Sequence, residues 1–450
     1  MVEGNETGPP EQLKPYERQC GNWIRAYLDF TSESESPESY HLWAGISAIA
    51  SAVRRNVWLD QGLYVLFPNL YIAFIGPPAR TAKSTALYLQ KGIINNIPGV
   101  KMGPAACSRE QLIRAMAESK FDNQCALTIH SSEFSDLIDT SGILMIQFLT
   151  TIYDGNYVDA AGWKYETKHQ GKDNIINPFL NMIIGTTPSY FAESMPESIV
   201  GHGFTSRTII VYEEKERHQN PRPRANDSAL AKALVDDLRH ISRIRGEFKW
   251  GGNVLRKDDD GNAVTEAMDT YDRYYRSLYD NVPVDHRLEG FHWRKKTHVL
   301  KVAMLLALAE RDDLIIQSRD VETAAQFLRD LEPSMARAFS AVGRNEFASV
   351  IERIGSQVRL AGEISLEDIY SRNYSAGSAY ELDNVIQTLE KMGAVRRKSV
   401  IKDGTVITML ATPTTQKALP WAVKAKPVVK VEGEPGHEDH LGNGQDPAQR

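Results

Sequence analysis

The first part of the chain places apolar residues at three- and four-residue spacing. This pattern predicts helices over residues 22–30 and 40–53. Two short β-like runs, at 57–59 and 64–66, follow across a glycine turn. We therefore expect residues 14–66 to form an N-terminal helical region.

Between residues 67 and 217, apolar β-rich runs alternate with helical patterns. The pattern predicts strands at 70–75, 126–129, 179–184 and 208–212, and helices at 84–95, 108–119 and 143–152. Buried strands that alternate with helices are typical of a parallel sheet covered on both faces. The sequence thus predicts an α/β core, and no internal repeat is apparent.

The pattern changes twice more toward the C-terminus. Residues 226–342 read almost entirely as helix, apart from a turn-rich stretch at 250–261, and an Arg-Pro-rich linker precedes them. Residues 344–411 contain two helices followed by a hairpin, the order expected of a winged helix, which serves as either a DNA-binding or a protein-interaction module. Residues 1–13 and 413–450 are polar and rich in Gly and Pro, so we expect both to be disordered.

Composition narrows the class of protein. Apolar residues make up 42% of the 450 positions and charged residues 24%, which excludes a wholly disordered, collagen-like or coiled-coil chain. The net charge of −6 excludes a uniformly basic nucleic-acid binder but allows basic residues to line a channel. The three cysteines show neither metal-ligand nor disulfide spacing, and no apolar run is long enough for a membrane span. We expect a cytoplasmic protein without a membrane partner.

A candidate phosphate loop lies between the strand at 70–75 and the helix at 84–95. It ends in Lys83-Ser84-Thr85 at the start of that helix. Such a loop binds ATP because backbone N–H groups surround the phosphates, a lysine reaches the β/γ oxygens and a hydroxyl holds Mg²⁺. The predicted nucleotide-binding residues are Gly76, Pro77, Pro78, Ala79, Arg80, Thr81, Ala82, Lys83, Ser84 and Thr85. The alternative is an ordinary strand–helix turn with an exposed lysine.

The loop departs from the G-x-x-x-x-G-K-[ST] pattern at both glycines. Pro77 stands at the first and Ala82 at the second, while Gly76 comes one residue early. Alanine tolerates positive φ poorly. We therefore expect the loop to follow another path or to bind phosphate with altered geometry.

These residues carry a family resemblance. The run from Leu66 to Pro78, followed by Lys83-Ser84-Thr85, resembles a family of phage and mobile-element P-loop proteins often found fused to or beside primases. That family is related to superfamily 3 and minichromosome-maintenance-like AAA+ helicases, and its loops commonly replace the second glycine. The resemblance covers about residues 40–308. It implies an AAA+-like core with a helical lid, ATP and Mg²⁺ as cofactors, and a homo-oligomeric ring that acts on DNA with a primase or other replication protein.

The resemblance also suggests the remaining catalytic residues. The strand at 126–129 leads to Glu133, a candidate Walker B carboxylate and Mg²⁺ ligand with Ser84, although Ser132 replaces the usual aspartate. Thr186 or Thr187, at the end of the strand at 179–184, corresponds to a γ-phosphate sensor, and we favour Thr187. Each residue has a simpler interpretation, as an exposed strand-end glutamate or as loop hydroxyls.

Arginine supplies the last member of the predicted catalytic set. Arg207, just before the strand at 208–212, resembles an arginine finger that reaches the neighbouring subunit's γ-phosphate. A solvent-facing arginine is the alternative. The cluster at 294–296 is a weaker candidate for a phosphate contact from the lid, because a solvated first helical turn would look the same.

Two basic segments are candidate DNA contacts. Residues 163–172 alternate like a β-hairpin, and by resemblance this hairpin lies in a ring's pore and grips single-stranded DNA. The hairpin of the predicted winged helix is also basic and is expected to contact duplex DNA. The predicted DNA-binding residues are Lys164, Lys168, Lys172, Arg396, Arg397 and Lys398. An ordinary surface hairpin explains the first segment equally simply.

The sequence as a whole predicts an ATP-dependent DNA-translocating ring ATPase, a replicative helicase of a phage or mobile element in a bacterial or phage-infected cell. Two alternatives stay open. The lost loop glycine and Walker B aspartate also suit a nucleotide-binding helicase loader or DNA-binding scaffold with weak hydrolysis. A third interpretation is an ATPase switch that acts on another protein.

Overall fold

The computed structural model describes residues 16–134, 137, 142–155, 162–167, 171–194, 203–339, 348–374, 377–402 and 405–411. The predicted disordered segments 1–13 and 413–450 and the predicted DNA contact Lys168 lie outside these residues. The chain divides into two compact units, Met1–Gly343 and Arg344–Arg450.

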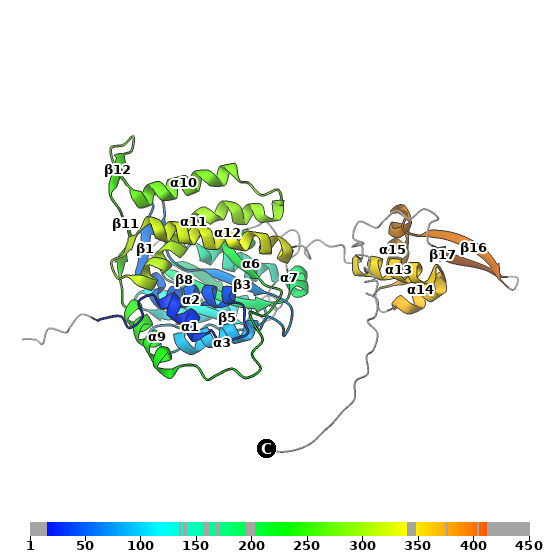
Figure 1. Ribbon diagram of the computed structural model, residues 1–450, viewed down its shortest axis with the longest axis horizontal. Coiled ribbons are helices and arrows are strands. Elements are labelled where there is room, and N and C mark those ends of the chain that lie inside the picture. Colours follow the sequence, from blue (N-terminus) through cyan, green and yellow to red (C-terminus); the bar gives the residue numbers. More distant parts are fainter. Residues whose placement is uncertain are drawn as a thin grey trace, which may run out of the picture. The chain divides into compact units, whose positions relative to one another are not determined.

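The first unit contains a five-stranded sheet with helices on both faces (Figure 1). The order of its strands is β4-β5-β8-β3-β9, and all neighbours are parallel except β4, which is antiparallel to β5. These strands are β3 (Tyr71–Ile75), β4 (Lys120–Phe121), β5 (Gln124–Ser131), β8 (Pro178–Thr186) and β9 (Thr208–Tyr212). The prediction of a mostly parallel α/β sheet is confirmed. The antiparallel edge strand β4 was not predicted.

The helices of this unit follow the predicted pattern closely where hydrophobic periodicity was strong. They are α1 (Trp23–Phe30), α2 (Glu38–Val53), α3 (Lys83–Ile94), α4 (Arg109–Glu118), α6 (Gly142–Tyr153), α7 (Pro188–Ser194), α8 (Gly203–Arg207), α9 (Ser228–Ile241), α10 (Glu266–Asp280), α11 (His286–Glu310) and α12 (Ser318–Ala338). Local signals fix several of their ends. In α4, for example, Ser108 and Gln111 form a capping box.

Short strand pairs border the main sheet. β1 (Val57–Asp60) pairs with β2 (Val65–Leu66) and with β10 (Gly246–Glu247). The other pairs are β6 (Trp163–Thr167) with β7 (Gly171–Ile175), β11 (Lys249–Trp250) with β14 (Ile315–Ile316), and β12 (Val254–Lys257) with β13 (Ala263–Thr265). The predicted hairpin in residues 163–172 is therefore confirmed as an antiparallel strand pair.

Buried residues join the N-terminal helices, the sheet and helices α9–α12 into one hydrophobic core. On one face of the sheet, the Asn181 amide donates to the hydroxyls of Ser47 and Ser51 on α2, both at 2.9 Å. On the other face, the Tyr71 hydroxyl donates to the Leu149 carbonyl of α6 at 2.9 Å. The sheet is thus held between α2, which precedes it in the chain, and α6, which lies between its strands β5 and β8. None of the helices in the described part of the chain has the length and apolar character to cross a bilayer.

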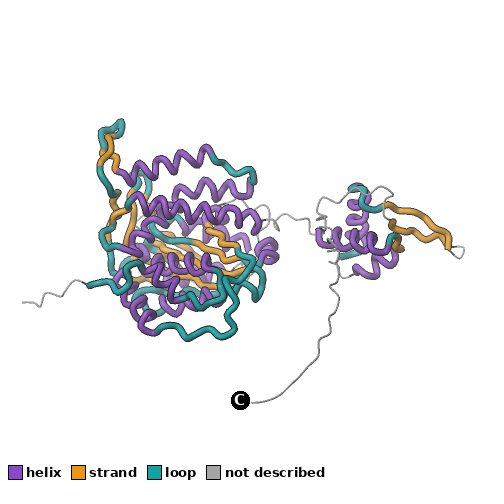
Figure 2. The backbone as a smooth tube through the Cα atoms, in the orientation of Figure 1, coloured by secondary structure: helices purple, strands orange, loops and turns teal. Residues whose placement is uncertain are grey.

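The second unit has its own hydrophobic core. Its elements are α13 (Ala348–Ala361), β15 (Glu363–Ser365), α14 (Leu366–Asn373), α15 (Ala379–Lys391), β16 (Arg396–Lys402) and β17 (Thr405–Ala411). The two helices and the β16–β17 hairpin were predicted, whereas α13 and β15 were not. β15 completes a three-stranded antiparallel sheet by pairing with β17. The long β16–β17 hairpin extends from the helices of this unit (Figure 2).

Candidate functional site

The predicted phosphate loop, Glu133 and Thr186 meet at the carboxyl edge of the sheet. The register pairs Ile75 of β3 with Thr186 of β8, and Ser131 of β5 with Ile184 of β8. The strands on both sides of β3 come later in the chain, so the loop after β3 lies at a topological switch point. Open α/β sheets bind ligands at this place.

The loop contains two alanines in the left-handed conformation. The φ angle is 60° at Ala79 and 42° at Ala82. Ala82 therefore does adopt positive φ, contrary to the view that alanine would avoid it here, at a cost of about 1–2 kcal/mol. A neighbouring contact helps to hold it, because the Ser36 hydroxyl donates to the Ala82 carbonyl at 2.7 Å.

Helix α3 begins without a capping side chain. Its N-cap residue is Ala82, which offers no side-chain oxygen to the first-turn N–H groups. Helix α4 differs, since Ser108 accepts a hydrogen bond from the Gln111 N–H. An uncapped first turn with its partial positive charge is a suitable binding site for an anion.

Lys83 lies at this uncapped helix start and is buried. Its ammonium donates to the carbonyl oxygens of Gly76 at 2.7 Å and of Pro77 at 3.2 Å. Burial lowers the pKa of Lys83 below its usual value, and the negative charge of Glu133 offsets part of this shift. The interpretation as an exposed turn lysine is therefore wrong. The ammonium is held inside the loop by neutral carbonyls, which an anionic oxygen can replace as partners.

Gly76 is the tightest position of the loop. A Cβ atom there would lie 2.6 Å from the Thr81 hydroxyl and 2.7 Å from both the Glu213 carbonyl and the Tyr40 hydroxyl. The Tyr40 hydroxyl itself donates to the Ile75 carbonyl at 2.8 Å. These contacts explain a glycine here although it stands one residue before the usual position.

We expect Gly76→Ala to destabilise the protein by about 1–3 kcal/mol, because the added methyl must displace backbone and buried hydroxyl atoms. Urea unfolding measures this. Gly92→Ala on α3 is the matched control, since a Cβ at Gly92 meets no atom within 4 Å. Alanine there should be neutral or stabilise the helix by up to about 1 kcal/mol. Equal stabilities of the two variants would contradict this account of the loop.

The remaining loop side chains divide between surface and interior. Thr81 is buried, whereas Ser84, Thr85 and Arg80 are exposed, and Arg80 forms an ion pair with Glu216 at 3.3 Å. Glu133 is also exposed.

The Ser84 hydroxyl and the Glu133 carboxylate are oxygen ligands of the kind Mg²⁺ prefers. No cluster of three or more metal-binding side chains occurs among the described residues.

The two candidate sensor threonines are placed differently. Thr186 is buried, and its carbonyl accepts a hydrogen bond from the Gly76 N–H at 3.3 Å. The Thr187 hydroxyl instead caps the next helix, α7, where it accepts a hydrogen bond from the Tyr190 N–H at 3.3 Å. Thr186 therefore contacts the loop directly, and Thr187 lies one residue further along.

Arg207 lies at the opposite edge of the sheet from Lys83. It ends α8, and the following residue, Thr208, pairs with Tyr71 at the start of β3. About 13 Å of strand, the length of β3, separates this edge from the phosphate loop at roughly 3.3 Å per residue. Arg207 thus cannot serve the loop of its own chain.

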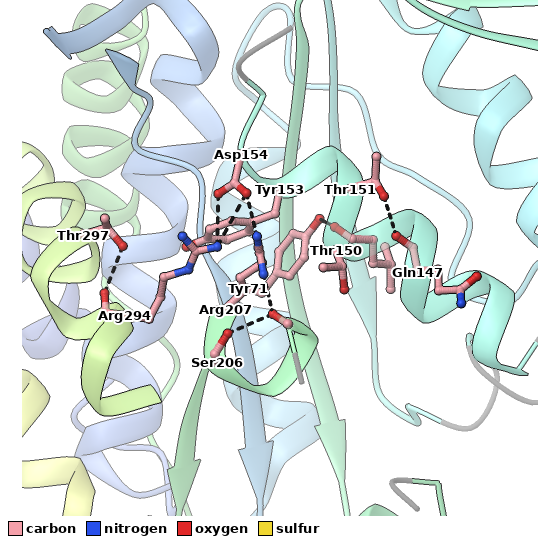
Figure 3. Close-up of polar contacts among 12 residues, drawn as sticks. Tyr71, Gln147, Thr150, Thr151, Tyr153, Asp154, Ser206, Arg207, Arg294 and Thr297 are labelled. Carbon is pink, nitrogen blue, oxygen red and sulfur yellow. Dashed lines mark hydrogen bonds and ion pairs between the residues drawn. The ribbon is translucent and has the colours of Figure 1, made fainter. Parts of the chain in front are cut away.

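Arg207 belongs to a cluster that converges on Asp154 (Figure 3). The guanidinium lies 2.6 Å from the Asp154 carboxylate, and Arg294 of α11 lies 3.3 Å from the same carboxylate. Both guanidinium groups also lie within 6 Å of the Tyr153 ring centre, at 5.8 and 5.9 Å. Burial by itself would raise the pKa of Asp154. The hydrogen bond from Arg207 and the nearby cations outweigh this effect, so the pKa of Asp154 lies below its usual value. The carboxylate therefore stays ionised and fixes both arginines.

The other two cations of the 294–296 cluster have partners of their own. Lys295 is buried and paired with Glu332 of α12. Lys296 lies over the Tyr275 ring, with 5.4 Å between the ammonium and the ring centre. Of residues 294–296, Arg294 therefore belongs to the Arg207 cluster. Lys295 links α11 to α12, and Lys296 links α11 to α10.

Two residues at the Arg207 cluster, Asp154 and Lys301, were not predicted from the sequence. Asp154 gave no motif, because its partners come from α8 and α11. Lys301 did give a signal, since it interrupts an otherwise apolar run. Its buried ammonium donates to the Asn69 side-chain oxygen at 2.8 Å, and burial lowers the pKa of Lys301 to about 7. It ties α11 to the residues before β3.

The predicted DNA contacts of the β6–β7 hairpin differ in how far the structure describes them. Lys164 on β6 is exposed, and Lys172 lies on β7 with a side chain outside the described part. The aromatic residues of this hairpin face the body of the unit: Trp163 packs on Phe148, and Tyr165 accepts a hydrogen bond from Arg109 at 2.8 Å.

In the second unit, the three predicted DNA-binding cations also differ. Arg396 is exposed. Arg397 pairs with Asp383 at 2.9 Å and with Glu390 at 3.1 Å, and Lys398 pairs with Glu363. Two of the three therefore already have carboxylate partners within the unit.

A scan against protein-family models and a search of curated proteins found no match to this chain.

Proposed function

We propose that this protein is an ATP-dependent DNA-translocating ring ATPase, a replicative DNA helicase of a phage or mobile element. One observation carries the proposal. The start of α3 has no side-chain cap, and the buried ammonium of Lys83 beside it donates to the loop carbonyls of Gly76 and Pro77, at the switch point of the sheet. This combination suits a polyphosphate and has no evident purely structural use.

The architecture supports an AAA+-like P-loop core. The strand with the phosphate loop, β3, lies between the sensor strand β8 and the last strand β9, and the acidic strand β5 lies beyond β8. Helices α9–α12 follow in the chain, and α12 reaches the edge strand β9, where Arg337 lies 5.6 Å from the ring centre of Tyr212. These helices are the proposed lid, and the second unit is the proposed winged helix.

Each residue of the edge then has a chemical role. Lys83 exchanges its carbonyl partners for phosphate oxygens, and the N–H groups of α3 add further donors. Glu133 orients and polarises the attacking water, and Ser84 and Glu133 would hold Mg²⁺. Bound Mg²⁺ neutralises charge on the transferred phosphoryl group. Thr186 and Thr187 are the sensor candidates, with Thr187 the residue expected from the sequence.

The ring follows from Arg207. Because Arg207 lies across the sheet from its own phosphate loop, its proposed action as a finger requires a second copy of the chain. Lys164, Lys168 and Lys172 are the proposed grip on single-stranded DNA in the pore, and a primase or other replication protein is the proposed partner. We place the protein in the cytoplasm of a bacterial or phage-infected cell.

Phosphate release measured with and without single-stranded DNA tests this function. We expect DNA to increase the rate of hydrolysis, and Glu133→Gln to abolish turnover while ATP binding persists, because the amide cannot polarise water. Unchanged turnover on adding DNA would favour a switch that acts on another protein.

One observation favours a second candidate, a helicase loader or DNA-binding scaffold with weak hydrolysis. Ser132 stands where a Walker B aspartate is usual, which leaves Glu133 as the carboxylate immediately after β5. Tight ATP binding with negligible turnover, even with DNA, would select this alternative over the translocating ATPase.

A further inference from the structure

A cavity of about 610 Å³ lies at the amino edge of the main sheet, opposite the phosphate loop. Its lining includes Gln124 at the start of β5, Asn177 directly before β8, and Phe67 shortly before β3. Parallel strands begin at this edge and end at the edge that carries the phosphate loop. The cavity is therefore separate from the proposed ATP site, and its volume is in the range of small-molecule sites.

Arg55 gives this cavity a cation without a paired acid. Its Nη1 donates to the Gly155 carbonyl at 2.8 Å and to the Pro178 carbonyl at 3.1 Å. Within the described part of the chain, its Nε and Nη2 have no hydrogen-bond partner and no carboxylate forms an ion pair with it. Burial lowers the pKa of Arg55 to about 10. A charge withdrawn from water usually has a counter-charge, so this guanidinium favours an anion from outside the chain.

The charges around Arg55 are mostly positive as well. Arg245 lines the cavity and pairs with Asp122, which is the one acid among the described lining residues. Burial and the charge of Arg245 lower the pKa of Arg54, and the charge of Asp122 offsets part of this shift. Three arginines therefore lie near one aspartate, in a protein whose net charge is −6. Such a local excess of positive charge attracts anions.

Flat aromatic surface and unused polar groups lie beside these cations. Arg55 stacks on Phe67, with 3.6 Å between the guanidinium carbon and the ring centre. Trp58 and Asn123 also line the cavity, and neither the indole N–H nor the side-chain amide has a hydrogen-bond partner among the described residues. A heteroaromatic ring can stack on the indole and bond to the amide, while the fork of Nε and Nη2 fits two oxygens of a phosphate.

We propose that this cavity binds a nucleoside 5′-monophosphate, with its base on Trp58 and its phosphate on Arg55. Asn123 is placed to bond to the edge of the base, and Arg245 adds a second cation for the phosphate. A nucleotide combines the flat ring, the polar edge and the anion that these groups suit, whereas inorganic phosphate would leave the ring and the amide unused. The site goes beyond the proposed function, because it lies at the other edge of the sheet and needs no hydrolysis.

Isothermal titration calorimetry of the nucleotide-free, full-length protein tests this site. The probes are the common ribonucleoside and deoxyribonucleoside 5′-monophosphates. We expect at least one to bind, and its parent nucleoside and inorganic phosphate each to bind at least about 10-fold more weakly, because each lacks part of the contacts. A 5′-phosphorylated oligonucleotide that binds more tightly than the free nucleotide would support the site and identify a strand end as the source of the same group.

Arg245→Gln and Arg243→Gln form a matched pair of variants. Arg245 lines the cavity, whereas Arg243 is exposed two positions earlier and does not line it. Arg245→Gln should weaken the nucleotide by at least about 5-fold and leave the nucleoside unchanged, because it removes a charge-assisted contact to the phosphate. Arg243→Gln should change neither. Thermal unfolding of the two variants should agree, since the ion pair that Arg245 loses is largely exposed.

Arg55→Gln should weaken the nucleotide by at least about 10-fold. Arg55 also holds two backbone carbonyls, so thermal unfolding of this variant is followed in parallel, and the Arg245 pair decides the matter if it unfolds.

No binding of any nucleotide up to millimolar concentrations would overturn the proposal, as would equal nucleotide affinities of Arg245→Gln and Arg243→Gln. Binding that Lys83→Ala abolishes would place the nucleotide in the phosphate loop and would overturn it as well. The titrations involve no turnover. An inactive ATPase would therefore count against the proposed function and leave the result at this cavity standing.

Discussion

Replacing Lys83 with alanine is expected to lower ATP hydrolysis by about two orders of magnitude or more, because the transferred phosphoryl group loses a charge-assisted partner in the transition state. ATP affinity should fall as well, since the loop loses its buried cation. Steady-state phosphate release and binding of a fluorescent ATP analogue measure the two effects. The wild-type ammonium already lies within the loop, so no rearrangement of the chain is needed to present it.

Lys91→Ala is the matched control for this variant. Lys91 is on the same helix, in its last turn, and is exposed. Its removal should leave hydrolysis within about 2-fold of wild type, because Lys91 lies at the end of α3 that is remote from the phosphate loop. If Lys83→Ala hydrolysed ATP as fast as Lys91→Ala, Lys83 would have no part in turnover and the proposed enzyme would be excluded.

The second large effect concerns Arg207. Arg207→Ala should retain ATP affinity, since the phosphate loop and Lys83 of the same chain are untouched, yet turnover should fall by about 10³-fold as the transition state loses its arginine. Mixing this variant with Lys83→Ala should restore part of the activity. Some interfaces of a mixed ring would then join an intact loop to an intact Arg207 from the neighbouring subunit.

Asp154→Asn separates a catalytic Arg207 from a structural one. The substitution removes the charge that fixes Arg207 and Arg294 but leaves both arginines in the chain. If Arg207 acts only through this ion pair, Asp154→Asn should reproduce the full loss of turnover. If Arg207 acts as an arginine finger, we expect Asp154→Asn to cause a smaller loss of turnover.

The mixing experiment has its own contrary outcome. No recovery of activity in verified mixed assemblies, or full activity of a monomer, would exclude action of Arg207 in trans.

The elements of the fold could be predicted because their causes are local. The apolar spacing around Trp23 and Trp43 gives α1 and α2, and the capping box at Ser108 gives the start of α4. Runs of apolar residues in the sequence predict each long strand to within two or three residues of its observed ends. β4 escaped prediction because it is two exposed residues long, Lys120 and Phe121, and so has no hydrophobic pattern.

Part of the candidate site was predictable for the same reason. Lys83 and Ser84 follow a buried strand and open a helix, and Glu133 follows another strand, so their order alone indicated a shared edge. The burial of Lys83 was not predictable, because it depends on carbonyls that the fold of the loop turns inward. The positive φ of Ala82 was judged unfavourable from alanine's intrinsic preference, and tertiary contacts such as that of Ser36 outweigh it.

By itself, the sequence determined the periodic elements, the helix caps and the strand–loop–helix at Lys83, since neighbouring residues suffice to specify them. Only the tertiary structure decided which charges are free to act. Asp154 gathers Arg207 and Arg294 from segments 53 and 140 residues away, and Arg397 is paired with Asp383 and Glu390 of α15. An ion pair forms between groups that folding brings within about 4 Å, and for residues of different elements the separation along the chain does not specify that distance.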